Sequence, residues 1–444
     1  MRPWSVAETV TRLAAVVDAR KMKMFAVIDH SGEATNEGSR CAIRSSSSSA
    51  VPRQEPRWWW LRRSRHSICR SRSSSGPTDP RRRSATPGRV RSLPATVAED
   101  RLNAFLGRAV GDMAASVSAV LVLIGDELGL YSALAGQRLS PGELAEKTGT
   151  SERYVREWLA NQAAGGYVDY DAENDQYYLN EEQTLCLADP NGPVDLPGAY
   201  QIIRDLFHVR ERAVQNFRTG KGMEWGEHHP CLFEGTERFF RAGYNANLVS
   251  SWLPALDGVV EKLTAGARAA DVGCGHGAST ILMAQAFPTS EFVGIDYHGA
   301  SIATATERAA KAGVTNAYFE VADATSYEGG DYDLIAFFDC LHDMADPIGA
   351  ARRARQALKP DGHCLLVEPM AGDHVADNLN PVGRLYYGAS SLVCVPVSLA
   401  QHGPALGAQA GEQRLRTVMV DEGGFTRFRR ATETPFNMIF EARP

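Results

Sequence analysis

Three glycines and an acidic residue in the second half of the chain have the spacing of a ligand-binding turn. Gly273, Gly275 and Gly277 follow a short apolar segment and precede a helical pattern, so the backbone could approach a ligand closely at a helix N-terminus. Asp296 follows about 20 residues later, where a carboxylate suits the hydroxyls of a ribose. The pattern from Gly273 to Ala278 also satisfies the dinucleotide fingerprint, so it leaves a nicotinamide cofactor open.

Further features favour a ligand with an ammonium group and an adenosine over a dinucleotide. Asp271 stands two residues before the first glycine, where a carboxylate would pair with an ammonium rather than with a pyrophosphate. Asp323 ends a later apolar segment, at a position on the adenine side. Thr434-Pro435 joins the last two expected strands and is too short for a crossover, so these strands form an antiparallel hairpin. That hairpin replaces the sixth parallel strand of a dinucleotide fold.

The elements that must position these residues alternate between strand and helix. Residues 251–444 therefore predict an α/β domain with a doubly wound, seven-stranded sheet and a terminal antiparallel hairpin. The expected strands cover 268–272, 292–295, 318–321, 334–338, 364–367, 425–433 and 436–442. A helix is expected near 412–420.

Residues 97–185 predict several helices followed by a hairpin, which is the pattern of a winged-helix domain. One amphipathic helix begins at Leu102, and a second, very apolar helix is expected from 115 to 134. A capping box at Ser140 to Glu143 begins the next helix, a further helix spans 152–164, and a hairpin spans 167–179. Residues 186–250 form an inter-domain helical segment.

The charge of the helix expected at 152–164 argues against nucleic acid as a partner. Arg153 and Arg156 are offset by Glu152 and Glu157, whereas DNA binding needs a basic face with several phosphate contacts. We therefore expect a homodimerisation domain, because the second helix is too apolar for a lone surface helix. A winged-helix transcriptional regulator that senses a cofactor remains an alternative.

The net charge of −6 conceals two different parts of the chain. Residues 1–100 hold 19 basic and 9 acidic residues, a net +10, which leaves 28 basic and 44 acidic residues, a net −16, in 101–444. Residues 1–38 resemble the start of a small bacterial α/β domain of unknown function. Residues 39–96 are rich in Arg and Ser and predict a disordered linker.

Two other interpretations of residues 39–96 stay open. An Arg/Ser-rich tail could bind nucleic acid through phosphates. Alternatively, the segment is a frameshifted remnant of the small domain, since the runs Trp58 to Trp60 and Ser45 to Ser49 suggest codons read out of frame and the segment contains Arg without Lys.

The composition predicts a cytoplasmic protein without a membrane partner. The eight cysteines contain no C-x-x-C pair, which is typical of reduced thiols rather than of a disulfide framework or a zinc knuckle. No secretory signal is visible at the N-terminus. The longest apolar run, 114–124, is shorter than the roughly 18–20 residues of a membrane span.

Residues 270–277 and 358–363 resemble motifs of class I S-adenosylmethionine-dependent methyltransferases. With the winged helix in front, residues 101–444 resemble a bacterial two-domain methyltransferase family that is related to O-methyltransferases. The resemblance implies S-adenosylmethionine as the cofactor and a small-molecule acceptor, with a hydroxyl as the expected methyl-accepting group. A nicotinamide-dependent oxidoreductase is the alternative enzyme.

The same resemblance implies roles for individual residues. The amino-acid part of the cofactor would lie on Asp271, Gly273 and Gly275, the ribose on Asp296 and the adenine on Asp323, while Asp339 would face the sulfonium region. Cys274, Gly277, Tyr297 and Ala324 are further expected cofactor-binding residues. His342 would be the general base, as in plant-type O-methyltransferases. Two departures are Met344, where that family has Trp, and the lack of a visible partner acid for His342.

Candidate acceptor residues come from two segments. Trp225, His228 and His229 would form a wall of the pocket, or else simply line the domain junction. Arg384, Tyr386 and Tyr387 lie in the insertion 371–409, expected to act as a lid, and would bind an anionic or aromatic acceptor or only pack. No metal is predicted, because adjacent histidines rarely point at one site and no third ligand is expected nearby.

Overall fold

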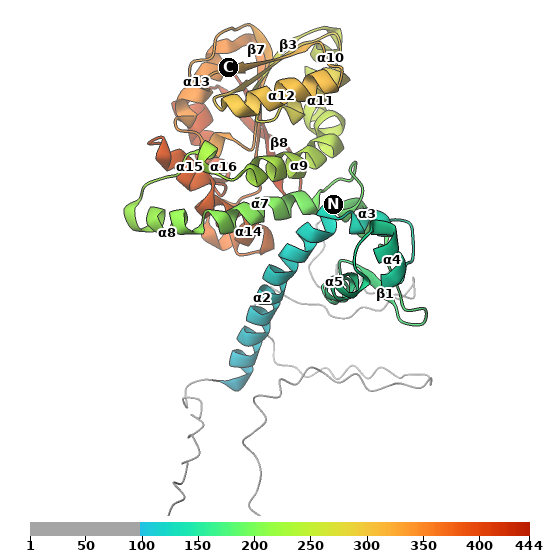
Figure 1. Ribbon diagram of the computed structural model, residues 1–444. Coiled ribbons are helices and arrows are strands. Elements are labelled where there is room, and N and C mark those ends of the chain that lie inside the picture. Colours follow the sequence, from blue (N-terminus) through green and yellow to red (C-terminus); the bar gives the residue numbers. More distant parts are fainter. Residues whose placement is uncertain (1–97) are drawn as a thin grey trace, which may run out of the picture. The chain divides into compact units, whose positions relative to one another are not determined.

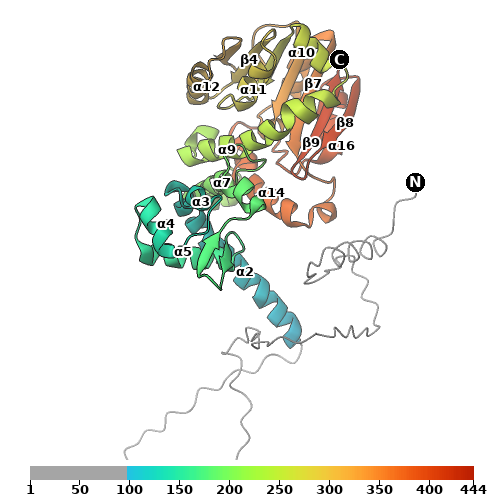
Figure 2. The same ribbon diagram turned by 90° about the vertical axis from the view of Figure 1, so that its right-hand side faces the viewer.

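The computed structural model describes residues 98–444 (Figure 1). The small domain predicted for 1–38 and the Arg/Ser-rich segment predicted for 39–96 lie outside these residues. The described part begins with a helical region, continues through connecting helices and ends in a sheet covered by helices on both faces (Figures 1 and 2).

The first region is the predicted winged helix. Its elements are α2 (Glu99–Glu127), α3 (Leu130–Leu134), α4 (Pro141–Thr148), α5 (Glu152–Ala164), β1 (Asp169–Asp171), β2 (Gln176–Tyr178) and α6 (Glu181–Leu187). The predicted capping box is confirmed, because the Glu143 amide donates to the Ser140 hydroxyl and the Ser140 amide donates to the Glu143 carboxylate. Leu130, Tyr131, Leu159 and Trp158 fill its core.

The start of this region differs from the expectation of two helices. One continuous helix, α2, covers most of both, and only the short α3 follows a turn at Gly129, whose φ is 66°. Gly107 and Gly111 do not break the helix. The physical reason is that a single glycine costs a helix only about 1 kcal/mol, which the long run of good helix formers outweighs.

Helix α2 also differs from the expectation for membrane spans. The sequence prediction considered only the apolar run 114–124, but α2 as a whole has the length and mean hydropathy of a membrane-crossing helix. It is the one such helix among the described residues. Only 17% of its most apolar window is buried. This exposed apolar surface therefore requires a partner of some kind.

A connecting region follows. It consists of α7 (Leu196–His208), α8 (Arg210–Thr219), the 3₁₀ turn η2 (Trp225–Glu227), α9 (Pro230–Asn247), the π turn η3 (Leu248–Trp252), the 3₁₀ turn η4 (Leu253–Ala255) and α10 (Val259–Ala265). Helices α7 and α9 pack closely along each other (Figure 1). Helix α9 also packs on α11 of the sheet domain, so it connects both regions.

The predicted seven-stranded sheet is confirmed. Its strands are β3 (Arg268–Val272), β4 (Glu291–Asp296), β5 (Ala317–Val321), β6 (Tyr332–Phe338), β7 (Leu358–Pro369), β8 (Arg427–Glu433) and β9 (Asn437–Arg443). Their order is β5-β4-β3-β6-β7-β9-β8, with β9 antiparallel to both β7 and β8. The order reverses between β3 and β6, and such a switch point is where ligands bind in open α/β sheets.

Two apolar layers enclose the sheet, because a mostly parallel sheet is buried on both faces. On one face Leu334, Ala336 and Phe338 of β6 pack with α10 and with α11 (Ala278–Ala286). On the other face Ile335 and Phe337 pack with α13 (Pro347–Ala357). Alternate residues of strand β6 thus pack in the apolar layers on opposite faces of the sheet.

The remaining elements complete the described part of the chain. They are α12 (Gly299–Lys311), the 3₁₀ turns η5 (Leu341–Asp343) and η6 (Val375–Asn378), α14 (Pro381–Leu392), α15 (Cys394–Ala400), α16 (Gly411–Arg416) and the π turn η7 (Thr417–Glu422). Elements η6, α14 and α15 form the insertion predicted at 371–409.

Candidate active site

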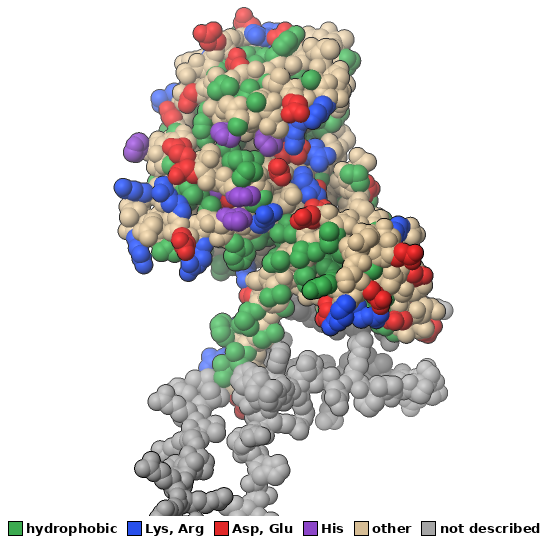
Figure 3. Space-filling model, viewed as in Figure 1, with side chains coloured by type: hydrophobic (Ala, Val, Ile, Leu, Met, Phe, Trp, Pro, Cys, Tyr) green, Lys and Arg blue, Asp and Glu red, His purple; other side chains and the backbone are tan. Residues whose placement is uncertain are grey.

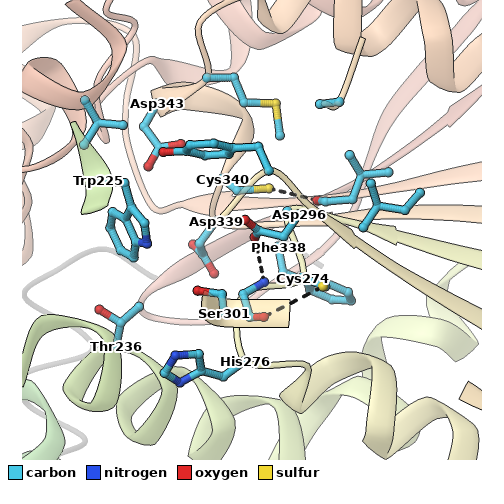
Figure 4. A pocket seen from close by; sticks show the side chains of 18 of the residues that line it. Trp225, Thr236, Cys274, His276, Asp296, Ser301, Phe338, Asp339, Cys340 and Asp343 are labelled. Atoms are coloured by element: carbon cyan, nitrogen blue, oxygen red, sulfur yellow. Dashed lines mark hydrogen bonds between the residues drawn. The ribbon is translucent and has the colours of Figure 1, made fainter. Parts of the chain in front are cut away.

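A cavity of about 290 Å³ lies at the carboxyl ends of β3, β4, β5 and β6. Figure 4 shows side chains from these strand ends directed into one space, with the Trp225 ring at its side. Helix α9 supplies a second wall, α15 contributes Val397, and Gln401 follows directly after α15. The cavity therefore joins the predicted glycine turn to the connecting region.

The glycine turn follows β3 directly. Gly273, Gly275 and Gly277 have φ values of 78°, 52° and 77°, which favour glycine. A Cβ atom at Gly273 would stand 2.7 Å from the Cys340 sulfur, whereas one at Gly275 would project into open space. The turn is therefore packed from behind at Gly273 and bare where a ligand would approach Gly275.

Asp271 lies behind the turn rather than on the cavity surface. Its Oδ2 accepts hydrogen bonds from the Ser279 and Thr280 hydroxyls, each at 2.6 Å, which ties β3 to the start of α11. Its Oδ1 is buried and has no partner. Burial raises the pKa of Asp271 to about 6, against the opposing effect of the two hydroxyls. An ammonium group near Oδ1 would satisfy this atom.

Asp296 ends β4 and holds the turn from the side. Its Oδ2 accepts from the Gly275 amide at 2.9 Å and its Oδ1 accepts from the His298 amide at 2.8 Å. Each oxygen keeps a further lone pair, which suits a vicinal diol. Burial raises the pKa of Asp296 despite the two amides. Tyr297 also lines the cavity, and its hydroxyl accepts from Gln401 at 3.4 Å.

Asp323 and Ala324 line the end of the cavity beyond β5. Asp323 Oδ1 accepts from the Thr325 amide at 2.7 Å, which fixes the turn, and this side chain is exposed. Its other oxygen makes no hydrogen bond to a described residue, so it is free to accept from an amino group of a ligand.

Asp339 and Asp343 line the cavity beyond β6. Asp339 Oδ1 accepts from the Asn437 amide nitrogen at 2.7 Å, and its Oδ2 is buried without a partner. Burial and then the nearby Glu368 carboxylate raise the pKa of Asp339 well above its usual range. Burial also raises the pKa of Asp343 to about 7.

His342 lies behind this surface and is not among the residues that line the cavity. Its Nδ1 is 2.6 Å from Glu368 Oε2, and the other oxygen of Glu368 accepts from the Leu341 amide. The structure thus supplies the partner acid that the sequence did not reveal. Burial opposes protonation of the ring, but the Glu368 carboxylate outweighs it and raises the pKa of His342 well above 6.5.

Of the predicted acceptor residues, the structure brings only Trp225 to the cavity. His228 is buried, with its Nδ1 at 2.6 Å from Asp205 Oδ2. Tyr386 is buried and donates to the Phe436 carbonyl at 2.8 Å. Arg384 pairs with Asp112 of α2 at 2.9 Å. Tyr387, also on α14, does not line the cavity, and neither does His229.

The expectation that no third donor lies near His229 is wrong. Donor atoms of His208, His229 and Cys231 all lie within 4.8 Å of one another. The two imidazole rings stack at 4.6 Å with an angle of 10° between their planes, so their in-plane lone pairs do not converge on one point. His229 Nδ1 also accepts from the Cys231 amide at 3.2 Å. The arrangement as it stands caps helix α9.

Helix α9 contributes cavity residues that sequence reasoning missed. Phe233, Thr236, Glu237, Phe240 and Tyr244 line the cavity from one side of the helix. Their spacing is that of any amphipathic helix face, so no sequence signal separated them from core residues. Glu237 is already paired with Arg241 at 2.8 Å and with Arg308 at 2.7 Å.

The charge of the lining separates the two cofactors left open by the glycine pattern. Six carboxyl side chains line the cavity, and none of the described lining residues is Lys or Arg; the acids are Glu237, Asp296, Asp323, Asp339, Asp343 and Asp346. Such a surface attracts a cation and repels the two negative charges of a pyrophosphate. The acidic lining therefore disfavours the pyrophosphate of a nicotinamide cofactor.

The winged helix likewise offers no basic face on α5. Arg153 pairs with Glu157 at 2.6 Å and Arg156 pairs with Glu152 at 2.5 Å, both on the exposed surface of the helix. These pairs neutralise the charges that would have contacted phosphates. The absence of a nucleic-acid partner stays a prediction.

Comparison with known families identifies both regions. Residues 263–419 match the family described as a methyltransferase domain, and residues 115–189 match the Rv2258c-like winged HTH domain. The 27-O-demethylrifamycin SV methyltransferase of Amycolatopsis mediterranei is 34% identical over 131 residues, covering 28% of this chain and 48% of that protein. The trans-aconitate 2-methyltransferase of Variovorax paradoxus is 32% identical over 162 residues, covering 36% of this chain and 54% of that protein.

The chain thus spans about half the length of these curated relatives. Solved structures extend the similarity of fold over most of the chain. A putative O-methyltransferase from Nostoc punctiforme has a TM-score of 0.58 at 18% identity, covering 80% of this chain and all of that one. Human N-acetylserotonin methyltransferase has a TM-score of 0.55 at 17% identity, covering 79% and 99%. The chain therefore carries a methyltransferase domain behind an Rv2258c-like winged helix-turn-helix domain, and its fold is that of a two-domain class I methyltransferase.

Proposed function

We propose that this protein is an S-adenosylmethionine-dependent methyltransferase that modifies a hydroxyl group of a small-molecule acceptor. The observation that carries the proposal is the cavity at the switch point of the sheet, where a bare glycine turn meets six carboxyl side chains and no basic residue. When bound, S-adenosylmethionine supplies a methyl group on a sulfonium cation. A cavity lined by carboxyl groups, with no Lys or Arg among its described lining residues, matches that cation.

The residues fit this cofactor part by part. The bare turn at Gly275 fits an amino-acid group, and Asp271 supports this turn from behind, where its Oδ1 has no partner. The remaining lone pairs of Asp296 fit a ribose diol, and the free oxygen of Asp323 fits an amino group on an adenine. These assignments agree with those implied by the motifs of the sequence.

The acceptor side is aromatic and carries no cation. Trp225, Phe233, Phe240 and Tyr244 line this side of the cavity, with Val397 from α15. Arg384 is engaged by Asp112 and does not reach the cavity, so it does not supply a site for an anion. We infer a neutral, aromatic or otherwise apolar acceptor of small size.

The general-base role of His342 remains part of the proposal. Its pairing with Glu368 would hold the imidazole in one orientation, but the Glu368 carboxylate also favours the protonated ring, so His342 would act as a base only after losing that proton. The ring lies behind the cavity lining. The test is His342→Ala in a methyl-transfer assay, with unfolding measured in parallel. Unchanged turnover by a folded variant would remove this role.

We further propose a homodimer in the cytoplasm. Helix α2 exposes Phe105, Met113, Val117 and Val120, each more than half accessible, and Figure 3 shows hydrophobic side chains along this helix. An exposed apolar stripe of this length fits burial against a second copy. All six cysteines in 98–444 are free thiols, which fits a reducing compartment.

The decisive experiment compares ligands by calorimetry and thermal unfolding. S-adenosylmethionine and S-adenosylhomocysteine should bind and stabilise the full chain, by about 2.7 kcal/mol at a hundredfold excess over Kd, whereas NAD should not. Asp296→Asn should weaken binding of both by about 10- to 100-fold, because it removes charge-assisted hydrogen bonds. Asp361→Asn, at an exposed position outside the cavity, is the matched control.

Stabilisation by NAD alone would overturn the proposal. If the cofactor binds, a panel of phenols and aliphatic alcohols, screened by mass spectrometry for the gain of one methyl group, tests the acceptor class. Methylation of amines only would remove the hydroxyl assignment and keep the enzyme class.

A further inference from the structure

Asp339 has a backbone conformation that only a constrained residue adopts. It follows directly after β6, and its φ of 51° lies in the left-handed region, which is unfavourable for residues with a side chain. The Asp339 amide donates to the Val367 carbonyl of β7 at 2.8 Å, which holds the residue against the neighbouring strand. This conformation directs the carboxyl group into the cavity (Figure 4).

The two oxygens of Asp339 have different environments. Oδ1 accepts from the Asn437 side chain at 2.7 Å, and Asn437 begins the antiparallel strand β9. Oδ2 is buried and has no hydrogen-bond partner. A buried, unpartnered carboxylate oxygen is costly, whereas a protonated oxygen or one beside a cation is not. Asp339 Oδ2 therefore needs either a bound proton or a nearby positive charge to offset its burial.

The groups around Asp339 favour the proton while the cavity holds no cation. Two carboxyl groups face it, Glu368 from β7 and Asp343 from η5, and both disfavour a further negative charge. The His342 imidazole acts in the opposite direction. Tyr244 of α9 and Tyr386 of α14 are near enough for the charge of Asp339 to raise their pKa values, so both stay neutral phenols. Burial and Glu368 together hold the pKa of Asp339 well above its usual value.

The position of Asp339 in the sheet sets it apart from the other cavity acids. Strand β6 pairs with β3 so that Phe337 stands opposite Val272, which places Asp339 close to Gly273. Asp296 and Asp323 follow β4 and β5 on the other side of β3 and serve the ribose and the adenine under the proposed function. Asp339 is therefore the carboxyl group beside the amino-acid half of the site, where the sulfonium joins the two halves of the cofactor.

We propose that Asp339 is a proton switch that distinguishes the sulfonium cofactor from its neutral thioether product. The carboxyl group carries a proton when the cavity is empty or holds the thioether, and it loses that proton when the sulfonium cation is bound. Binding of the cation is thereby coupled to release of one proton to solvent, and binding of the thioether is not. This inference rests on the proposed function and adds a reason for the product to be bound differently from the substrate.

The test measures protons rather than turnover. Isothermal titration of the full chain with S-adenosylmethionine and with S-adenosylhomocysteine, in buffers of different ionisation enthalpy, gives the number of protons released by each ligand. At about pH 6 the α-amino groups of both ligands are protonated, so they contribute little difference. We expect up to one more proton released with S-adenosylmethionine, and a Kd for it that rises up to about tenfold for each pH unit of acidification below the pKa of Asp339.

Two variants assign the proton to a residue. Asp339→Asn keeps the shape and an oxygen that accepts from Asn437, and it should abolish the difference between the ligands while still binding S-adenosylhomocysteine. Asp343→Asn is the matched control, because it removes the other cavity carboxyl with a pKa raised to about 7. We expect it to retain the difference. Loss of the difference in Asp343→Asn and not in Asp339→Asn would overturn the assignment.

The remaining outcomes are also decisive. If Asp339→Asn does not fold, Asn437→Leu tests the same group, because loss of the donor should raise the pKa of Asp339 and move the pH profile of S-adenosylmethionine binding upward. Equal proton release by both ligands in the wild-type protein would overturn the switch and leave the proposed function intact. Failure of both ligands to bind would instead overturn the proposed function.

Discussion

At the scale of single residues, buried carboxyl groups dominate the site. Asp271 and Asp339 each keep one oxygen without a partner, and Asp296 uses both oxygens to hold the backbone of the turn. Behind them, Glu368 fixes His342 and the Leu341 amide at once. One set of carboxyl groups is thus open to a ligand, while Glu368 supports the turn that carries Asp343.

The pair of His342 and Glu368 predicts a pH-dependent stability. Both side chains are almost fully buried, so Glu368→Gln should lower the free energy of unfolding by about 3–5 kcal/mol at neutral pH, because the charge of His342 loses its partner. The folded pKa of His342 is raised, so the contribution of the pair is complete below the unfolded pKa of about 6.5 and is lost as pH rises through the folded pKa.

Urea unfolding at a series of pH values checks this prediction. The wild-type protein should lose stability across the alkaline range, and Glu368→Gln should show a smaller loss over the same range. Glu307→Gln, which removes an exposed partner of Lys311, should behave as the wild type. Identical pH profiles for Glu368→Gln and the wild type would show that the pair does not carry the effect.

At the scale of elements, the ends of the strands decide what the cavity contains. Strands β3, β4, β5 and β6 deliver their polar side chains to one edge because they are parallel neighbours. Helix α9 closes the cavity with aromatic side chains, and α15 of the insertion, with Gln401 directly after it, adds two further contacts. The element without such a role is α2, whose apolar stripe is left uncovered by the described residues.

Helix α2 predicts the oligomeric state. Val117→Asp combined with Val120→Asp should convert a dimer into monomers, because each places a charge in the exposed stripe. Ala115→Asp adds the same charge on the opposite, also exposed side of the helix and should leave the dimer intact. Light scattering after size-exclusion chromatography measures the mass.

A monomeric wild-type protein would contradict the dimer. Lipid is the other candidate partner of this stripe, because the length and mean hydropathy of α2 reach those of a membrane-crossing helix. Co-sedimentation of the wild-type protein with phosphatidylcholine vesicles tests the other possibility. Binding to vesicles by a monomer would assign the stripe to a membrane.

At the scale of the whole described molecule, one arginine joins the winged helix to the catalytic part. Arg238 of α9 donates to both oxygens of Asp126 in α2, at 2.7 and 3.1 Å, and to both oxygens of Asp195 at the N-terminus of α7, at 3.2 and 3.0 Å. The two carboxylates raise the pKa of Arg238 and hold its guanidinium in one orientation. The planar geometry of arginine makes both pairs possible at once.

Arg238→Ala should therefore lower stability more than a surface substitution does. We expect a loss of about 1.5–3 kcal/mol in the free energy of unfolding, because two partly buried carboxylates lose charge-assisted hydrogen bonds. Arg153→Ala, which breaks an exposed pair on α5, should have no measurable effect. Differential scanning calorimetry gives the comparison, and equal melting temperatures for the two variants would contradict it.

Much of the site followed from local sequence. The glycines from Gly273 to Gly277 and the acids Asp296, Asp323 and Asp339 all stand at or just after the carboxyl end of a predicted strand, and the structure places them at one edge. Periodicity could not show the partner of His342, because Glu368 is 26 residues away on a neighbouring strand. It also could not separate the cavity face of α9 from an ordinary core face.

The predicted acceptor residues failed to gather for a similar reason. Arg384, Tyr386 and His228 have the right chemistry, but each is engaged by a distant residue: Asp112, Phe436 and Asp205 respectively. Side-chain type alone does not say which partner a residue meets across the fold. The boundary between the two helices expected at the start was wrong because Gly107 and Gly111 lie inside α2, and the chain turns only at Gly129.

By itself, then, the sequence determined the alternation of strands and helices, the glycine turn and the order of the acids that follow the strands, since these depend on local conformation and on hydrophobic period. The tertiary structure alone decided which oxygens are left without partners, that Arg238 joins α2 to α7 and α9, and that six carboxyl groups share one cavity without a basic residue. Those properties depend on strand order and helix packing, which bring together residues far apart in the chain.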